Sequence, residues 1–115
     1  ADFEVTTDSI GAPPEGMGQI VFFRPTATGL FSYVIREDDS DLSRLPSEHY
    51  LVHHAEPGIH EYSINENWFV RFEVKPGKTY FVTALSNGRL MQSGQSAFHA
   101  IEPSLRPVAS TEPTH

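Results

Sequence analysis

Short runs of apolar and β-branched residues recur along the chain, and most of them end at Gly, Pro, Asn or Asp. The clearest run is 68–74, where every second residue is apolar and the alternate positions include Arg71 and Glu73. Such a period of two predicts a strand with one buried face. The runs predict strands at 19–24, 30–36, 41–45, 50–54, 59–64, 68–74, 79–85 and 89–92, with a weaker run at 97–101. No stretch shows a helical period with capping residues.

Many short strands separated by turn residues predict an all-β fold, a single β-sandwich of about 7–9 antiparallel strands. The length of 115 residues fits one domain. We expect an extended lead-in at 1–18, the sandwich at 19–101 and a loose, proline-containing tail at 102–115. An additional edge strand around Phe3 and Val5 is left open.

The expected core consists of the apolar residues on one face of each strand. These are Ile20, Phe22, Tyr33, Ile35, Val52, Ile59, Trp68, Val70, Phe72, Tyr80, Val82 and Ala84. A slip of one residue turns a strand over, so Val21 and Phe23, or Phe81 and Leu85, are alternatives.

Two Pro-Gly pairs, Pro57-Gly58 and Pro76-Gly77, stand between predicted strands. Proline presets φ at one turn position and glycine permits positive φ at the next, so each pair predicts a tight turn. Asn87-Gly88 is a strong hairpin signal and predicts that 89–92 returns beside 79–85.

The composition removes several classes of function. The chain has only eight Lys and Arg residues and a formal net charge of −7, which disfavours binding to nucleic acid or to anionic membrane surfaces. No cysteine is present, so a disulfide framework and thiolate metal sites are excluded. No apolar run approaches the ~20 residues of a membrane-spanning helix. The opening Ala1-Asp2 is expected either of a secreted or lipidated chain whose leader has been removed or of a trimmed expression product.

The histidines are the candidate metal ligands. His53 and His54 lie just before the Pro57-Gly58 turn and His60 lies just after it, so the turn brings neighbouring strands within reach of one ion. The alternative is that these are ordinary surface or half-buried histidines. In that case the ring of His60 hydrogen-bonds the carbonyls of the turn and holds the corner.

Other chemistry finds little support. The acidic run 37–41 lacks the glycine and distal glutamate of a helical calcium loop, so we interpret it as a solvated hairpin tip. Ser96 follows Gly94 at the right spacing, but the second glycine of a nucleophile elbow is missing. Glu61 and Glu73 are expected on outward faces, without an apolar pocket to change their acidity. We therefore expect no catalytic residue, no cofactor and no enzyme activity.

Three motifs together resemble a family. They are an apolar strand ending in Arg24-Pro25, the segment Pro57-Gly58-Ile59-His60, and the segment 74–80 with its Gly-Lys-Thr-Tyr sequence. The chain resembles an uncharacterised bacterial domain-of-unknown-function family whose members are mostly small envelope lipoproteins and periplasmic proteins. The resemblance covers about residues 18–100. It implies an immunoglobulin-like or prealbumin-like sandwich in the cell envelope and supplies no catalytic residue. The residues that carry it, with an expected structural role, are Arg24, Pro25, Pro57, Gly58, His60, Gly77, Lys78 and Tyr80.

The expected function is that of a non-enzymatic envelope module, periplasmic or of lipoprotein type, that binds or has a structural role. It would contact another envelope protein or a cell-wall polymer through an edge strand or loop surface. Membrane attachment would require a lipid anchor, for which this chain has no cysteine. Trp68 and Tyr62, if both faced solvent, would form an aromatic platform for sugar or peptide. The alternative is a small-ligand or metal-ion carrier that uses His53, His54 and His60.

Overall fold

The computed structural model describes residues 10–25, 33–64, 67–85 and 88–108, without the side chains of Asn67 and Trp68. The edge strand considered around Phe3 and Val5 and the predicted burial of Trp68 lie outside the described residues.

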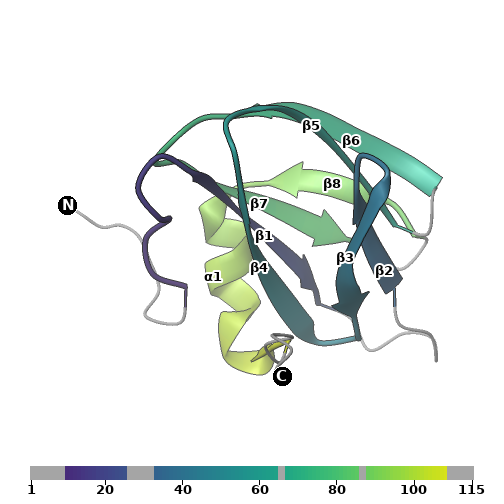
Figure 1. Cartoon of the computed structure of the whole chain (residues 1–115). Coiled ribbons are helices and arrows are strands. Elements are labelled where there is room, and N and C mark those ends of the chain that lie inside the picture. Colours follow the sequence, from purple (N-terminus) through teal and green to yellow (C-terminus); the bar gives the residue numbers. More distant parts are fainter. Residues whose placement is uncertain (1–9, 26–32, 65–66, 86–87, 109–115) are drawn as a thin grey trace, which may run out of the picture.

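The described residues form two β-sheets and one short α-helix (Figure 1). Sheet A has the strand order β8 (Leu90–Ser93), β7 (Thr79–Ala84), β1 (Gly18–Arg24), β4 (His49–Ala55) and β9 (Arg106–Pro107). Sheet B has the order β3 (Ser40–Leu45), β2 (Tyr33–Glu37), β5 (Gly58–Ile64) and β6 (Asn67–Val74). The prediction of a mainly β, sandwich-like fold is confirmed.

The prediction that all strands are antiparallel is wrong. β1 pairs with β7 in parallel, with Val21 opposite Phe81, and β4 pairs in parallel with β9. After β1 the chain passes through sheet B to β4 of sheet A, crosses to sheet B again for β5 and β6, and returns to sheet A at β7, which lies beside β1 in the same direction. Alternating sequence patterns do not report strand direction, which depends on these connections.

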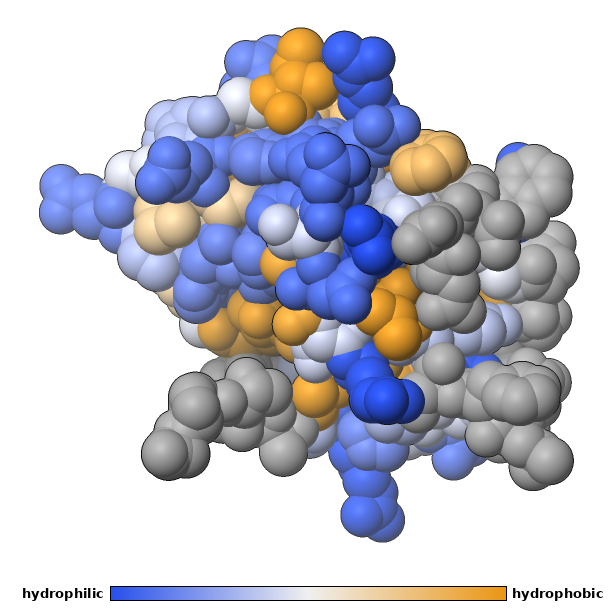
Figure 2. Space-filling model, turned by 45° about the vertical axis from the view of Figure 1, so that its right-hand side comes forward, coloured by the Kyte–Doolittle hydropathy of each residue, from blue (hydrophilic) through white to orange (hydrophobic). Residues whose placement is uncertain are grey.

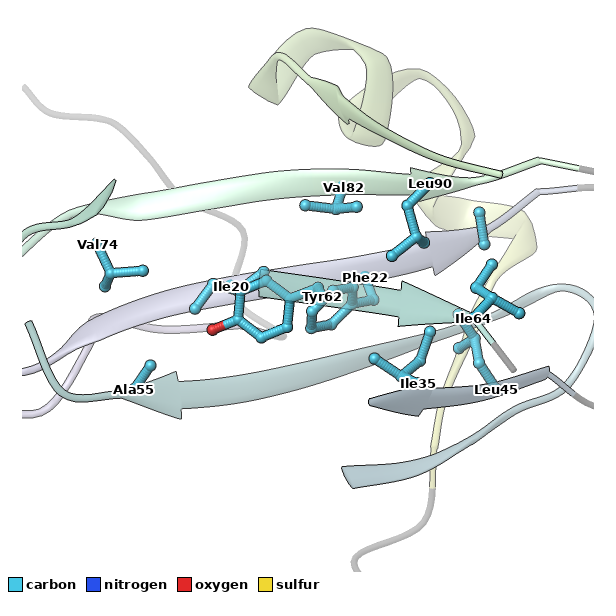
Figure 3. Packing of buried hydrophobic residues seen from close by; sticks show 11 residues of the cluster. Ile20, Phe22, Ile35, Leu45, Ala55, Tyr62, Ile64, Val74, Val82 and Leu90 are labelled. Carbon is cyan, nitrogen blue, oxygen red and sulfur yellow. The ribbon is translucent and has the colours of Figure 1, made fainter. Parts of the chain in front are cut away.

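Strand β1 lies at the centre of sheet A and is buried along its whole length. Ile20 and Phe22 face the space between the sheets, where the ring of Phe22 packs against that of Tyr62 (Figure 3). Val21 and Phe23 face the opposite side, where α1 (Gln95–Ile101) covers the sheet. Both sets of residues that the sequence offered for the core are therefore buried, because this strand has no solvent-exposed face.

Helix α1 replaces the strand expected at 97–101, and that prediction is wrong. Its buried residue is Phe98, which packs on the outer face of sheet A. The next segment is a 3-10 helix, Glu102–Ser104, followed by the buried Leu105 and by β9. Residues 102–108 thus pack on the domain rather than forming the start of a loose tail, and Figure 1 shows α1 beside β4 and β1.

The predicted core is correct for most positions. Ile20, Phe22, Ile35, Val82 and Ala84 are buried between the sheets, and Tyr33, Val70, Phe72 and Tyr80 pack against them. Val52 packs instead on the α1 side. Ile59 is wrongly assigned, because it lies on the outer face of sheet B with 61% of its surface exposed.

The two Pro-Gly pairs mark corners at which the chain passes between the sheets. Pro57-Gly58 joins β4 of sheet A to β5 of sheet B, and Pro76-Gly77 joins β6 of sheet B to β7 of sheet A. Gly58 and Gly77 have φ of 137° and 77°, conformations that favour glycine. The predicted return of the chain beside 79–85 is confirmed by the antiparallel pairing of β7 with β8, while Asn87 lies outside the described residues.

Candidate functional site

The three candidate metal ligands do not come together. His53 and His54 are adjacent in β4, so their side chains leave opposite faces of sheet A. His54 Nε2 lies 2.8 Å from Gln19 Oε1 on the outer side. Partial burial lowers the pKa of His54, and the neighbouring His53 lowers it further. The prediction of a metal site built from all three histidines is therefore wrong.

His53 and His60 instead meet at the carboxylate of Glu37. Glu37 Oε2 lies 3.0 Å from His53 Nε2 and 3.2 Å from His60 Nδ1. It also accepts a 2.8 Å hydrogen bond from the hydroxyl of Tyr62. We call Glu37, His53, His60 and Tyr62 the Glu37 cluster. Since His53 belongs to sheet A and the other three belong to sheet B, the cluster ties the sheets together at one end.

The corner role expected for His60 is confirmed. Its Nε2 lies 2.8 Å from the carbonyl oxygen of Glu56, just before the Pro57-Gly58 turn. A carbonyl only accepts, so Nε2 is the donor. This bond orients the ring so that Nδ1 faces Glu37 Oε2 and, at 3.6 Å, Asp38 Oδ2. His60 thus holds the turn through Nε2, while its buried Nδ1 lies against Glu37 without making a hydrogen bond.

Tyr62 is fully buried, which excludes it from a solvent-facing aromatic platform. Burial raises the pKa of Tyr62 far above its usual range, and the hydrogen bond to Glu37 and the negative charges of Glu37 and Asp38 raise it further. The phenol therefore stays protonated and remains a donor to Glu37.

Replacing Tyr62 by phenylalanine is expected to lower the free energy of unfolding by about 1–2 kcal/mol. The substitution keeps the ring and removes a hydrogen bond to a charged, half-buried carboxylate. Urea unfolding measures the loss. Tyr80→Phe is the control, because the Tyr80 hydroxyl accepts from the exposed backbone of Lys75 and should contribute less. Equal stability of Tyr62→Phe and the unsubstituted protein would contradict this role.

The Glu37 cluster has the contacts of a structural clasp. Among the described residues, no group of three or more His, Asp or Glu side chains has the arrangement needed to hold a metal ion. The sequence interpretation missed Glu37, which it assigned to a solvated hairpin tip. The available signal was its position two residues after the buried Ile35, which puts both side chains on the inner face of β2.

The residues of the family-like motifs hold other junctions of the fold. Arg24 is 2% exposed, donates to the carbonyl oxygen of Leu45 in β3 and lies 3.7 Å from the centre of the Tyr33 ring. It therefore joins sheet A to sheet B at the end opposite the Glu37 cluster. The carbonyl oxygen of Lys78 accepts from Gln19 N–H, and this contact ties the second Pro-Gly corner to β1.

Strand β6 is an edge of sheet B, and its register with β5 shows where its backbone groups point. Glu61 of β5 donates its N–H to Asp38 Oδ1, and its carbonyl accepts from the N–H of Asp38. Both groups of Glu61 thus point away from β6. In an antiparallel ladder, the residue opposite a non-hydrogen-bonded position also points away. Arg71 is that residue, so the N–H and C=O of Arg71 and, two positions on, of Glu73 point outward from the sheet.

We call this outer side of β6 the β6 edge. Within the described part of the chain, no strand pairs with it. Two large apolar side chains flank it on the outer face of sheet B, Ile59 with 61% and Phe69 with 57% of its surface exposed. In the view of Figure 2, surface hydrophobic residues are interrupted by hydrophilic ones. The outward backbone groups of β6, which no described strand pairs, are the distinctive feature of this edge.

The fold and these contacts of the described residues define a two-sheet β domain with an outer helix, a structural polar cluster at Glu37 and an open strand edge at β6. Comparison with protein-family models, curated proteins and solved structures finds no match. Neither helix of the described residues is long and apolar enough to cross a membrane.

Proposed function

We propose that this chain is a non-enzymatic binding module of the bacterial cell envelope, with an immunoglobulin-like or prealbumin-like sandwich, that contacts another protein through the β6 edge. One observation carries the proposal: the outward N–H and C=O groups of Arg71 and Glu73 on an eight-residue edge strand. The envelope location, periplasmic or lipid-anchored, is supported by the resemblance of the Arg24-Pro25, Pro57-to-His60 and 74–80 motifs to envelope proteins.

The mode of binding is β-strand addition. An extended segment of the partner pairs with the outward backbone groups, and its side chains contact those that β6 and β5 present. Phe69 and Ile59 give apolar contacts on the outer face, while Arg71 and Glu73 give charged ones. A protein fits this surface better than a cell-wall polymer, because backbone groups recognise a backbone and Tyr62 is buried away from any sugar.

Affinity capture from envelope extract tests this function with matched variants. Glu73→Pro removes one outward N–H without removing a β5–β6 hydrogen bond, since that N–H points away from β5. We expect capture of the partner to fall at least about tenfold in this variant. Phe69→Ser should weaken capture, whereas Met91→Ser, which removes a similarly exposed side chain from β8, should not. Capture that is unchanged in Glu73→Pro would refute binding at the β6 edge.

A further inference from the structure

We infer that the β6 edge pairs with the β6 edge of a second copy of this chain, in an antiparallel register centred on Phe72, to form a two-fold symmetric dimer. The inference rests on the proposed function in using the same edge, and it names the partner. It follows from three features: the state of the other sheet edges, the direction of the backbone groups and the order of the charges.

The other three sheet edges carry features that oppose strand pairing. β3 pairs with β2 through a register shift between Ile35 and Arg36, β8 is four residues long, and β9 is two residues long and includes Pro107. Bulges, short strands and proline are the usual means of blocking edge-to-edge contact. β6 is eight residues long and contains no proline. Its own register shift with β5 lies before Val70, and the register is unbroken from Val70 to Val74. β4 beyond Tyr50 also lacks an outer partner strand among the described residues, and β6 is preferred because the charges of Arg71 and Glu73 are self-complementary.

The backbone groups fit the register centred on Phe72. In that register Arg71 of each copy lies opposite Glu73 of the other, and both residues point their N–H and C=O groups outward. Each such pair exchanges two hydrogen bonds, as an antiparallel hydrogen-bonded pair does. Phe72 lies on the two-fold axis, where its own backbone groups face β5 and no bond between copies is needed. Farther along, the N–H of Lys75 already donates to Tyr80, which marks the end of the available edge.

The charges select the same register. The side chains of Arg71 and Glu73 are exposed on the outer face of sheet B. In the register centred on Phe72, Arg71 of each copy lies opposite Glu73 of the other copy, so unlike charges face each other. Centring the pair on Arg71 or on Glu73 would instead place two like charges opposite each other. Glu61 lies opposite Arg71 within one copy, so the assembled sheet would alternate acidic and basic side chains across the junction. A self-complementary patch of this kind is what a two-fold interface requires.

Sedimentation velocity over a dilution series from millimolar to micromolar protein tests the dimer. The net charge of −7 makes the copies repel, so the salt should be about 0.15 M, where that repulsion is screened beyond about 8 Å. We expect a monomer–dimer equilibrium. Arg71→Glu and Glu73→Arg alone should each raise the dimer dissociation constant about tenfold or more, because each places like charges opposite at both contacts. The double variant R71E/E73R restores unlike pairs and should return to within about threefold of the original value.

Thermal melts of each variant, followed by circular dichroism, separate lost pairing from lost folding. Glu73→Pro should keep the monomer folded and abolish the dimer. A protein that stays monomeric at every concentration, a dimer that survives Glu73→Pro, or a double variant no better than the single ones would overturn the inference. If the protein is monomeric while envelope capture still depends on Glu73, the second copy is refuted and the proposed function stands. If the protein is monomeric and capture is also insensitive to Glu73→Pro, both the dimer and the proposed function are refuted.

Discussion

Replacing Phe98 by alanine is expected to lower the free energy of unfolding by about 3–5 kcal/mol. Phe98 is fully buried, and its ring centre lies 5.3 Å from that of Phe23 and 5.4 Å from those of Tyr50 and Phe81. Removing the ring leaves a cavity between α1 and sheet A and removes the one buried side chain of the helix. The free energy of unfolding of a natural domain is about 5–15 kcal/mol in total, so this loss is a large part of its stability.

Denaturant unfolding measures this change, and Phe69→Ala is the matched control. Phe69 is the same residue type with 57% of its surface exposed, so its truncation should change the stability by less than about 1 kcal/mol. If the two variants lose equal stability, α1 does not cover sheet A through Phe98.

Gly18→Ala is expected to lower the free energy of unfolding by about 1–3 kcal/mol. A Cβ on Gly18 would overlap Cγ1 of Val74 and lie 2.9 Å from the carbonyl oxygen of Lys75. Val74 is fully buried, and the Lys75 carbonyl belongs to the backbone of the second Pro-Gly corner, so neither can move aside cheaply. The close approach of β1 to the end of β6 therefore requires glycine at this position.

Gly94→Ala is the control for this substitution. Nothing lies within 4 Å of a Cβ added at Gly94, and its φ of −93° suits any residue. The free energy of unfolding of Gly94→Ala should stay within about 1 kcal/mol of that of the unsubstituted protein. Thermal unfolding of the two variants and the unsubstituted protein gives the comparison. A Gly18→Ala protein that melts at the original temperature would contradict the close packing of β1 on β6.

The strands were predictable because their side chains alternate and their ends carry turn residues. Residues 68–74 have a period of two, and β6 is found there; the two Pro-Gly pairs stand at the observed corners between the sheets. Strand direction was not predictable, because the parallel pairing of β1 with β7 depends on a crossing from sheet B. Helix α1 was missed because seven residues with one buried side chain show no helical period.

The Glu37 cluster was predictable from the sequence only in part. The corner contact of His60 followed from its place after Pro57-Gly58, since a ring there reaches the carbonyls of the turn. Glu37 was missed because its neighbours Asp38 and Asp39 are exposed, and the acidic run looks uniform in sequence. The alternation of side chains, with Glu37 two residues after the predicted core residue Ile35, was the signal that places it on the inner face, and its pairing with Tyr62 in β5 agrees.

Amide hydrogen exchange along β6 tests the central claim most directly. In dilute protein, Val70 and Phe72 should be protected because their groups face β5, whereas Arg71 and Glu73 should exchange freely. With rising protein concentration, Arg71 and Glu73 should become protected as a second copy pairs with them. Arg71 and Glu73 amides that are protected even in dilute protein, or that exchange freely at every concentration, would contradict an open edge that accepts a second copy.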